Sequence, residues 1–254
     1  MTVLTRVLPP EDYDLLAAEL GESPETVICL HHLRRRSCSV VIAGKVDCFS
    51  AAIVQLAELP EEPTGYGTDP AAMWALLQEL TGWMCLNVPF ILSGRIRELA
   101  KRKGTPTRTV QDIYHVMRQP SPTIAVPHVR RLTVVDTDLV EASPPDLHGA
   151  GFDSVGEMLA AGIAAGAIVD DRLVAIAHTS ALTECYADIG VFTLPDFRGR
   201  GYASAAAAVV AAEIQANGKA PVWSCGDHNR VSLRVASKLG FEEVSRRMYV
   251  VFED

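Results

Sequence analysis

The sequence has 254 residues, of which 48% are hydrophobic and 21% are charged. These proportions are typical of globular proteins and exclude a disordered, collagen-like or coiled-coil chain. The longest uninterrupted apolar stretch, Leu159 to Val169, has 11 residues. Because that is about half of what a membrane-spanning helix needs, we expect no transmembrane helix. The first residues lack the features of a signal peptide, which predicts a cytoplasmic protein.

The formal net charge of −8 divides into −2 for residues 1–127 and −6 for the remainder. A protein that binds nucleic acid usually carries a basic stripe. Here the basic clusters are short, Arg34 to Arg36 and Lys101 to Lys103, and such runs indicate solvated faces. The six cysteines contain no pair two residues apart, and the adjacent His31 and His32 make poor metal geometry. We therefore expect neither a nucleic-acid partner nor a metal site.

A proline-rich segment divides the chain. Residues 119–127 contain three prolines, which deny backbone donors to a helix or a central strand. This pattern predicts a linker over 120–127 between an N-terminal α/β domain, 1–119, and a C-terminal domain, 128–254. In the first domain the apolar periodicity predicts helices over 10–20, 70–80 and 94–103, a strand over 50–56 and a surface loop over 58–67.

The C-terminal domain alternates strands and helices more clearly. Its pattern predicts, in chain order, a strand over 128–135, a helix over 153–161, strands over 167–169, 173–179 and 186–193, a helix from about 200 to 217, a strand over 221–225, a helix over 230–238 and a strand over 248–252. This order predicts an α/β (α+β) fold, a mixed sheet with helices on its faces. A faint echo between Leu99 to Gly104 and Val235 to Gly240 suggests a duplicated domain with a degenerate first half.

The most informative stretch runs from Ile189 to Ser204, where a strand ends in a loop whose glycines open a helix. Backbone N–H groups and the helix dipole then favour an anion at one spot. Gly199 and Gly201 permit close approach, and Arg198 and Arg200 add charge-assisted hydrogen bonds. The stretch predicts a phosphate or pyrophosphate site, and it lacks the lysine of a P-loop and the third glycine of a dinucleotide fingerprint. A tight turn without a ligand remains the alternative.

Two motifs together resemble those of a known family. Arg198-x-x-Gly201-x-Ala203 resembles the coenzyme A pyrophosphate signature of the GNAT acetyltransferase superfamily. Pro221 to Cys225, followed by Asn229, Ser232 and Lys238 to Phe241, resembles its partner motif. The residues of both motifs, including Thr193-Leu194-Pro195 and Trp223, are most similar to those of the zwittermicin-resistance acetyltransferases, a subgroup of this superfamily. The resemblance covers roughly residues 128–254.

The resemblance implies a GNAT acyl-CoA transferase fold in the C-terminal half, with acetyl-CoA as co-substrate and no metal. It implies that main-chain groups of Val191, Phe192 and Thr193 pair with the pantetheine arm as an added strand would. It also implies coenzyme contacts from Asn229 and Ser232. The residues that match the pyrophosphate loop are Arg198, Gly199, Arg200, Gly201, Tyr202, Ala203 and Ser204.

The catalytic residues are not assigned, because Ala187 and Ala236 stand where many family members have a glutamate base and a tyrosine acid. The side chains with reach are Glu184, Asp188, Ser224, Asp227, His228 and Ser232. Strand alternation places Asp188 on the face opposite Ala187, which counts against it. Asp227 and His228 are interpreted as caps of the helix that begins near Asn229. Cys225 is interpreted as a small buried apolar residue.

The resemblance therefore predicts an N-acetyltransferase that moves an acetyl group from acetyl-CoA to a primary amine of a small molecule, with the N-terminal half shaping or covering the acceptor site. The charge of −6 on the second half favours a cationic acceptor. Two alternatives stay open: an acyl-CoA-binding module without catalysis, which the two alanines favour, and an acetyltransferase that modifies a protein partner. We expect a monomer or a homodimer without a membrane partner.

Overall fold

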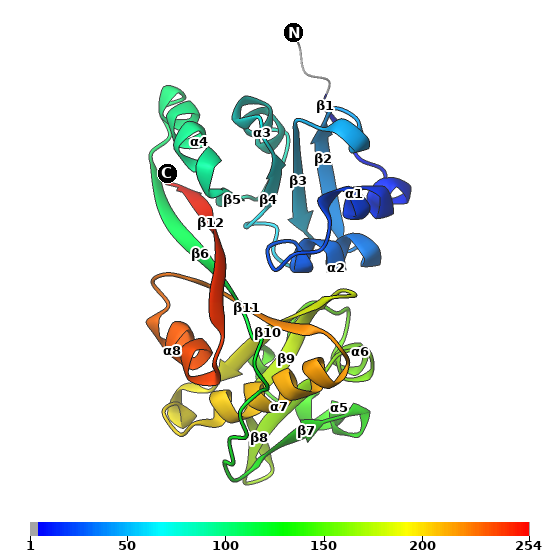
Figure 1. Ribbon diagram of the computed structural model, residues 1–254, viewed down its shortest axis with the longest axis vertical. Coiled ribbons are helices and arrows are strands. Elements are labelled where there is room, and N and C mark those ends of the chain that lie inside the picture. Colours follow the sequence, from blue (N-terminus) through cyan, green and yellow to red (C-terminus); the bar gives the residue numbers. More distant parts are fainter. Residues whose placement is uncertain (1–4, 254) are drawn as a thin grey trace. The chain divides into compact units, whose positions relative to one another are not determined.

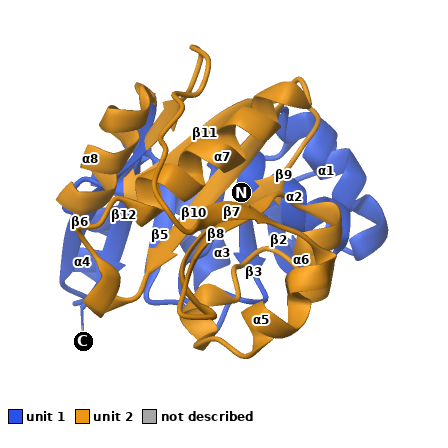
Figure 2. Ribbon diagram, turned by 90° about the horizontal axis from the view of Figure 1, so that it is seen from below, with its two compact units in different colours: residues 1–113, 226–228, 245–254 blue, residues 114–225, 229–244 orange. Residues whose placement is uncertain are grey.

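The computed structural model describes residues 5–253 (Figure 1). Their contacts define two compact units (Figure 2). Unit 1 comprises residues up to 113 together with 226–228 and the segment from 245, and unit 2 comprises 114–225 and 229–244. Neither unit is a continuous piece of chain, because strands β6 (Thr107–Val116) and β12 (Glu242–Phe252) each contribute residues to both. The sequence-based boundaries, by contrast, are contiguous.

Unit 1 begins with β1 (Thr5–Val7), α1 (Tyr13–Leu20), α2 (Val27–Arg35), β2 (Cys38–Ala43), β3 (Ala51–Leu56), β4 (Thr64–Gly67), α3 (Pro70–Leu77), β5 (Cys85–Pro89) and α4 (Phe90–Arg102), and β6 follows. Strands β1 to β4 are antiparallel neighbours in chain order, and β5 pairs with β4 in parallel and with β12 antiparallel. Helices α1 and α2 share one hydrophobic cluster with the sheet, and α3 and α4 share another.

Unit 2 contains β7 (Val129–Leu132), α5 (Thr137–Glu141), α6 (Val155–Ala161), β8 (Ala164–Val169), β9 (Arg172–Leu182), β10 (Tyr186–Thr193), α7 (Tyr202–Ala216), β11 (Ala220–Gly226) and α8 (Arg230–Leu239), and β12 follows. Strands β7 to β10 are antiparallel neighbours, and β11 pairs with β10 in parallel. Short 3₁₀ helices lie at Pro10–Asp12, Val46–Cys48, Val134–Asp136, Pro145–Leu147 and Pro195–Phe197.

Residues 5–116 and 129–252 repeat one order of elements. Each half runs strand, two helices, three strands, helix, strand, helix and strand, apart from the short 3₁₀ helices. The layering repeats too, because α5 and α6 pack in one cluster of unit 2 while α7 and α8 pack in another. The duplication that the sequence echo suggested is therefore present in the fold.

Helix α7 brings small side chains to the sheet of unit 2. Three consecutive alanines, Ala206 to Ala208, are buried together with Ala187 and Ala236 around Trp223, which is 1% exposed. Small residues let the helix approach the strands closely, and the indole fills the remaining volume. This packing fixes where the start of α7 stands relative to the end of β10.

The segment between β6 and β7, residues 117–128, contains no helix or strand, as its prolines predicted. It is nevertheless held in place. The main-chain N–H of Ser121 donates to Gln215 Oε1 at 2.9 Å, and the Ser121 hydroxyl donates to the carbonyl of Ala208 at 2.9 Å. The segment thus lies along helix α7 of unit 2.

Most predicted elements are confirmed, and the errors concentrate in the first half. The stretch 58–67, expected as a loop, ends in strand β4, where Tyr66 is buried. Helices α2 and α5 and strands β1, β2, β5 and β6 were not predicted. Within the described residues no helix has the length and hydropathy that a membrane span requires.

The entry to α5 depends on one carboxylate. Asp136 accepts hydrogen bonds from the Arg130 guanidinium at 2.6 and 3.0 Å and from the Thr133 N–H at 2.9 Å. The hydrogen bond from Arg130 is the main cause that lowers the pKa of Asp136. A carboxyl whose pKa is lowered on folding stabilises the protein above its unfolded pKa, and this contribution disappears as the pH falls through its folded pKa.

We predict that Asp136→Asn lowers the free energy of unfolding by about 2 kcal/mol at pH 7, since hydrogen bonds to charged groups contribute about that much. Urea unfolding followed by circular dichroism measures the change. Asp138→Asn is the matched control, because Asp138 is exposed in the first turn of α5 and forms no side-chain hydrogen bond there. The difference between Asp136→Asn and the wild type should shrink in acid, and a difference independent of pH would contradict this account.

Candidate active site

Strands β10 and β11 begin as a parallel pair and then separate. They pair at Tyr186↔Ala220, Ala187↔Pro221 and Asp188↔Val222, and within residues 5–253 this ladder extends no further. On its other side β10 stays paired with β9 as far as Thr193↔Ala175. The second half of β10 therefore has one satisfied edge and one open edge.

The main-chain groups of Val191 and Thr193 lie on the open edge. The N–H of Leu194 donates to the carbonyl of Val174 on β9 at 3.0 Å. Because successive residues of a strand direct their main-chain groups to opposite sides, Phe192 also faces β9, whereas Val191 and Thr193 face away from it. Of the three residues expected to pair with pantetheine, two thus present main-chain groups to the opening, and Phe192 has only its side chain to offer.

The loop after β10 ends in an uncapped helix start. Gly199 and Gly201 have φ angles of 77° and 84°, which only glycine adopts without strain. Gly201 occupies the N-cap position of α7, and no side chain caps the helix. The first intrahelical N–H to find a partner is that of Ala205, which donates to Gly201 at 3.0 Å. The preceding N–H groups form a positive end that suits an anion.

Two arginines stand beside this helix start. Arg198 donates through Nε to the carbonyl of Thr193 at 3.1 Å, so it covers part of the open edge. Arg200 donates to the carbonyl of Asp196 at 3.1 Å, and its guanidinium lies 5.0 Å from the centre of the Phe197 ring. Each guanidinium has five N–H donors, so most of them remain available to a phosphate group.

Asn229 and Ser232, the two predicted coenzyme contacts on α8, take part in local structure. The side chain of Asn229 accepts from the N–H of Ser232 at 3.1 Å and caps the helix. The hydroxyl of Ser232 accepts from the indole N–H of Trp223 at 2.9 Å. The interpretation of Asp227 and His228 as the caps was wrong, because the N-cap is the adjacent Asn229, whose side-chain Oδ1 accepts from the N–H of the third residue of the helix.

Asp227 and His228 belong to unit 1. Their side chains lie 3.9 Å apart, and the N–H of Asp227 donates to the carbonyl of Gln111 at 2.9 Å. Asp188 and Ser224, in contrast, both lie in unit 2. The structure thus brings together one pair of the catalytic candidates and assigns the other pair to a different unit.

Asp188 is the centre of a small polar cluster. Its carboxylate, in a residue 5% exposed, accepts from the hydroxyl of Ser180 at 2.6 Å and from that of Ser224 at 3.3 Å. The cluster lies at the last paired residues of β10 and β11, where the two strands separate. Ala187 is buried in the core with Trp223, which confirms that Asp188 faces the opposite side. Asp188 thus lies opposite the usual position of the base, and what keeps it a candidate is its contact with Ser224 at the place where the two strands separate.

Ser180 was missed by the sequence analysis. The register passes from Asp188↔Ala181 to Ile189↔Thr179, so Ser180 is an extra residue in β9, a β-bulge. The glycine Gly151 makes room for the bulge, because a β-carbon there would stand 1.7 Å from the Ser180 carbonyl oxygen. An alternation pattern does not show such a bulge, and the sequence carried no other signal for it.

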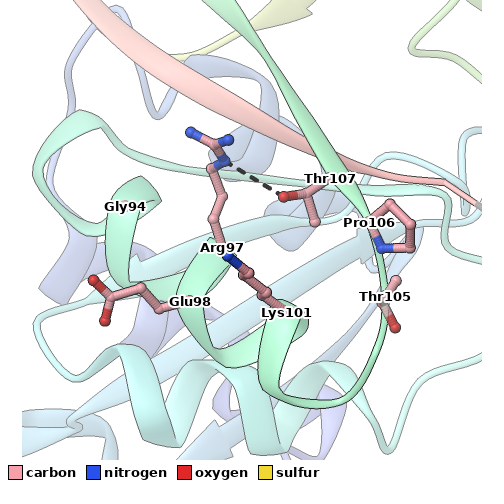
Figure 3. A pocket seen from close by; sticks show the side chains of 7 residues that line it. All are labelled: Gly94, Arg97, Glu98, Lys101, Thr105, Pro106 and Thr107. Atoms are coloured by element: carbon pink, nitrogen blue, oxygen red, sulfur yellow. Dashed lines mark hydrogen bonds between the residues drawn. The ribbon is translucent and has the colours of Figure 1, made fainter.

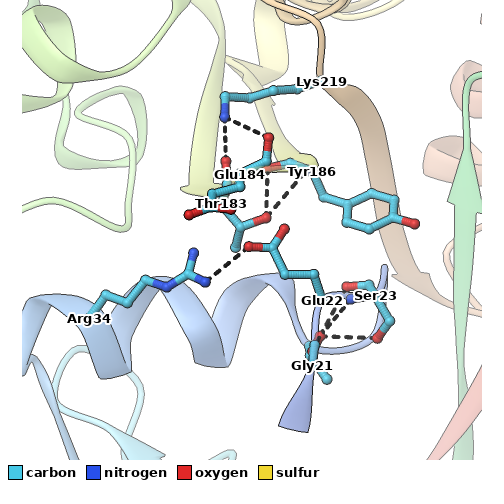
Figure 4. A network of polar contacts seen from close by, with 9 residues as sticks. Gly21, Glu22, Ser23, Arg34, Thr183, Glu184, Tyr186 and Lys219 are labelled. Carbon is cyan, nitrogen blue, oxygen red and sulfur yellow. Dashed lines mark hydrogen bonds and ion pairs between the residues drawn. The ribbon is translucent and has the colours of Figure 1, made fainter. Parts of the chain in front are cut away.

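Lys219 fixes the turn between β9 and β10. Its ammonium donates to the carbonyl of Thr183 and, at 2.9 Å, to that of Glu184 (Figure 4). The turn is closed by the N–H of Tyr186, which donates to the Thr183 hydroxyl at 3.1 Å. Glu184 thus contributes a main-chain acceptor to the turn that starts β10. Figure 4 also draws an ion pair of unit 1, between Arg34 and Glu22 at 2.9 Å.

Each unit has a cavity of its own. In unit 1 a cavity of about 380 Å³ lies between α4 and the start of β6 and includes Arg97, whose Nε lies 3.4 Å from the Thr107 hydroxyl (Figure 3). In unit 2 a cavity of about 220 Å³ is lined by residues between His148 and Met158. The ring of His178 accepts the N–H of Ala150 at 3.0 Å at this second cavity. Among residues 5–253 no cluster of three or more histidine, cysteine or acidic side chains is arranged to bind a metal.

The strand opening, the glycine loop and the uncapped helix lie within the part of the chain that matches a known family. The family model described as GNAT acetyltransferase matches residues 112–252. The chain belongs to the GNAT acetyltransferase family and is an acetyltransferase. Members of this family use acetyl-CoA as co-substrate. A search of curated proteins found no match.

Solved structures share the fold over the whole chain. A GCN5-related N-acetyltransferase-like protein from Streptococcus suis is 21% identical, with a TM-score of 0.69 and coverage of 96% of this chain and 99% of that chain. A putative GNAT-family acetyltransferase from Novosphingobium aromaticivorans is 20% identical, with a TM-score of 0.59 and coverage of 92% and 99%. A tandem GNAT protein from the clavulanic acid biosynthesis pathway is 14% identical, with a TM-score of 0.60 and coverage of 98% of both chains.

Because Ser232 accepts the indole N–H of a buried tryptophan, we predict that Ser232→Ala destabilises the protein. An unpaired buried donor costs about 1–3 kcal/mol, measurable as a lower urea midpoint. Ser237→Ala, an exposed position on the same helix, should change the midpoint little. Equal midpoints for the two variants would show that the hydrogen bond between Trp223 and Ser232 contributes nothing to stability.

Proposed function

We propose that the protein transfers an acetyl group from acetyl-CoA to a primary amine of a small molecule, and that unit 2 holds the coenzyme. The observation that carries the proposal is the juxtaposition of the open edge of β10 with the uncapped start of α7. One offers main-chain groups to an extended amide chain, and the other offers N–H groups to a pyrophosphate. Few ligands combine these two chemistries, and coenzyme A does.

In this proposal the pyrophosphate lies against the N–H groups that follow Gly199 and Gly201. Arg198 and Arg200 supply charge-assisted hydrogen bonds, for which Arg198 exchanges its bond to the Thr193 carbonyl. The pantetheine amides then pair with Val191 and Thr193. Asn229 and Ser232 support the site indirectly, since they fix the start of α8 and the position of Trp223.

The reaction requires a neutral amine, which attacks the thioester carbonyl, and coenzyme A departs as the thiolate. A main-chain N–H on the open edge of β10 stabilises the developing oxyanion. The Asp188 carboxylate is proposed to receive the proton from the ammonium, and the Ser224 hydroxyl, which donates to that carboxylate, relays it. With Ala187 and Ala236 at the usual positions of base and acid, orientation of the two substrates supplies a large part of the rate enhancement.

The acceptor is proposed to be cationic, because the second half of the chain carries a charge of −6. The residues of the two motifs support a relationship to the zwittermicin-resistance type of acetyltransferase. The two alternatives have distinct signatures. A module without catalysis would bind acetyl-CoA and release no thiol with any amine, and an enzyme for a protein partner would increase the mass of that partner by one acetyl group.

We predict that Gly201→Glu abolishes binding of acetyl-CoA, since it adds a negative side chain where the helix N–H groups converge. Gly218→Glu is the matched control, because Gly218 follows the other end of α7 with a φ of 72° and open space around it. Both variants add the same charge at a glycine with a positive φ. Isothermal titration with acetyl-CoA should show binding to the wild type and to Gly218→Glu alone.

Absence of binding to the folded wild type at saturating coenzyme would overturn the proposal. Loss of binding in both variants would show that charge or strain in general, and not the start of α7, is responsible. Once binding is shown, a panel of primary amines monitored by thiol release identifies the acceptor. Tetraamines and amino sugars with several amines are the polycationic members, and amino alcohols with a single amine are their monocationic controls.

A further inference from the structure

Unit 1 contains the counterparts of the three elements that form the proposed coenzyme site. By the repeated order of elements, β4, α3 and β5 correspond to β10, α7 and β11. Strands β4 and β5 are also a parallel pair that separates, with a single paired position at Thr64↔Asn87. The two places where the coenzyme would bind, the helix start and the strand opening, are therefore both present in unit 1 in outline.

The helix start in unit 1 is already satisfied. Asp69 is the N-cap of α3, and its carboxylate accepts from the N–H groups of Ala71 at 2.8 Å and Ala72 at 3.2 Å. Pro70, the first residue of the helix, has no N–H group that would need a partner. A negative side chain thus occupies the position that Gly201 leaves bare at the start of α7, and it would repel a pyrophosphate.

The strand opening in unit 1 is filled by Arg247 of β12. The N–H of Asn87 donates to the carbonyl of Pro63 at 2.9 Å, and a continued ladder would next need an N–H at residue 89, which is proline. The carbonyl of Gly65 is left without that donor, and Arg247 Nη2 supplies one at 2.6 Å. The same nitrogen donates to the carbonyl of Asn87 at 3.2 Å. One guanidinium thus bridges the two separating strands.

The guanidinium is held firmly at this position. Arg247 is 2% exposed, and its Nε donates to the side chain of Asn87. Asn87 in turn donates to Asp112 at 2.9 Å. Arg247 Nη1 lies 3.6 Å from the Glu25 carboxylate, and its Cζ lies 4.9 Å from the centre of the Tyr66 ring. Removing a buried and paired cation from such surroundings is costly, so a pantetheine arm does not displace it.

We infer that the chain binds one acyl-CoA, in unit 2, and that Asp69 and Arg247 are the residues that exclude the coenzyme from unit 1. This inference rests on the proposed function, because it concerns the number and place of the coenzyme sites. It also assigns a role to the most buried charged side chain of unit 1. Asp69 occupies the place of the pyrophosphate and Arg247 the place of the pantetheine.

Two measurements on the full chain test the inference. Native mass spectrometry with acetyl-CoA counts the bound coenzymes, and we expect one on the wild type, one on Gly218→Glu and none on Gly201→Glu. Hydrogen–deuterium exchange locates the site without any variant. We expect acetyl-CoA to slow exchange at least tenfold in peptides that cover 191–204 and to leave those that cover 64–72 unchanged.

The outcomes separate this inference from the proposed function. Two bound coenzymes on the wild type with one retained by Gly201→Glu, or protection of 64–72 together with 191–204, would overturn the inference and leave the transferase proposal standing. Protection of 64–72 alone would overturn the inference and the placement of the coenzyme in unit 2. No bound coenzyme on the folded wild type, together with no protection anywhere, would overturn both. If Gly201→Glu fails to fold, the count and the exchange pattern of the wild type still decide.

Discussion

The constraint on which the site depends is the separation of a parallel strand pair. Where β10 leaves β11, main-chain donors and acceptors lose their partners, and unpaired backbone groups in a protein interior are costly. Such an opening persists only when something else satisfies those groups. In unit 2 the exposed Arg198 side chain donates a hydrogen bond to one of these groups, the Thr193 carbonyl. In unit 1 the buried Arg247 takes the equivalent role, so the two halves meet one constraint in different ways.

The difference has an electrostatic counterpart at the two helix starts. Asp69 satisfies α3 from within the chain and neutralises its positive end, whereas Gly201 leaves α7 to be satisfied by water or by an anion. A capping side chain stabilises a helix by only about a few tenths of a kcal/mol relative to glycine at the same position, so α7 lacks a small stabilisation that α3 has. Its alanine-rich contact with the sheet compensates, because packing on the strands holds the helix without a cap.

The sequence predicted the elements whose signals are local. Strand 186–193 is bounded by turns, and glycine punctuates both ends of α7, so their bounds were close to those observed. Strand β4 was missed because it has four residues, two of them glycine, and its burial comes from neighbours elsewhere in the chain. Arg247 lay outside the predicted strand 248–252 and was not singled out, since its partner Asn87 lies 160 positions earlier. Long-range pairing of this kind leaves no trace in periodicity.

The contrast between local and long-range signals also explains why the sequence predicted a coenzyme site but did not identify the catalytic residues. Coenzyme binding depends on main-chain groups, glycines and arginines within one short stretch, so its signature is compact. The Asp188 cluster combines residues from three strands with a bulge at Ser180. The sequence of any one strand therefore contains no signal for it. In the proposed function, coenzyme binding and proton transfer therefore involve different parts of unit 2. Substitution at Ser224 should therefore alter turnover of an amine while leaving the affinity for acetyl-CoA intact, a separation that titration and thiol release measure independently.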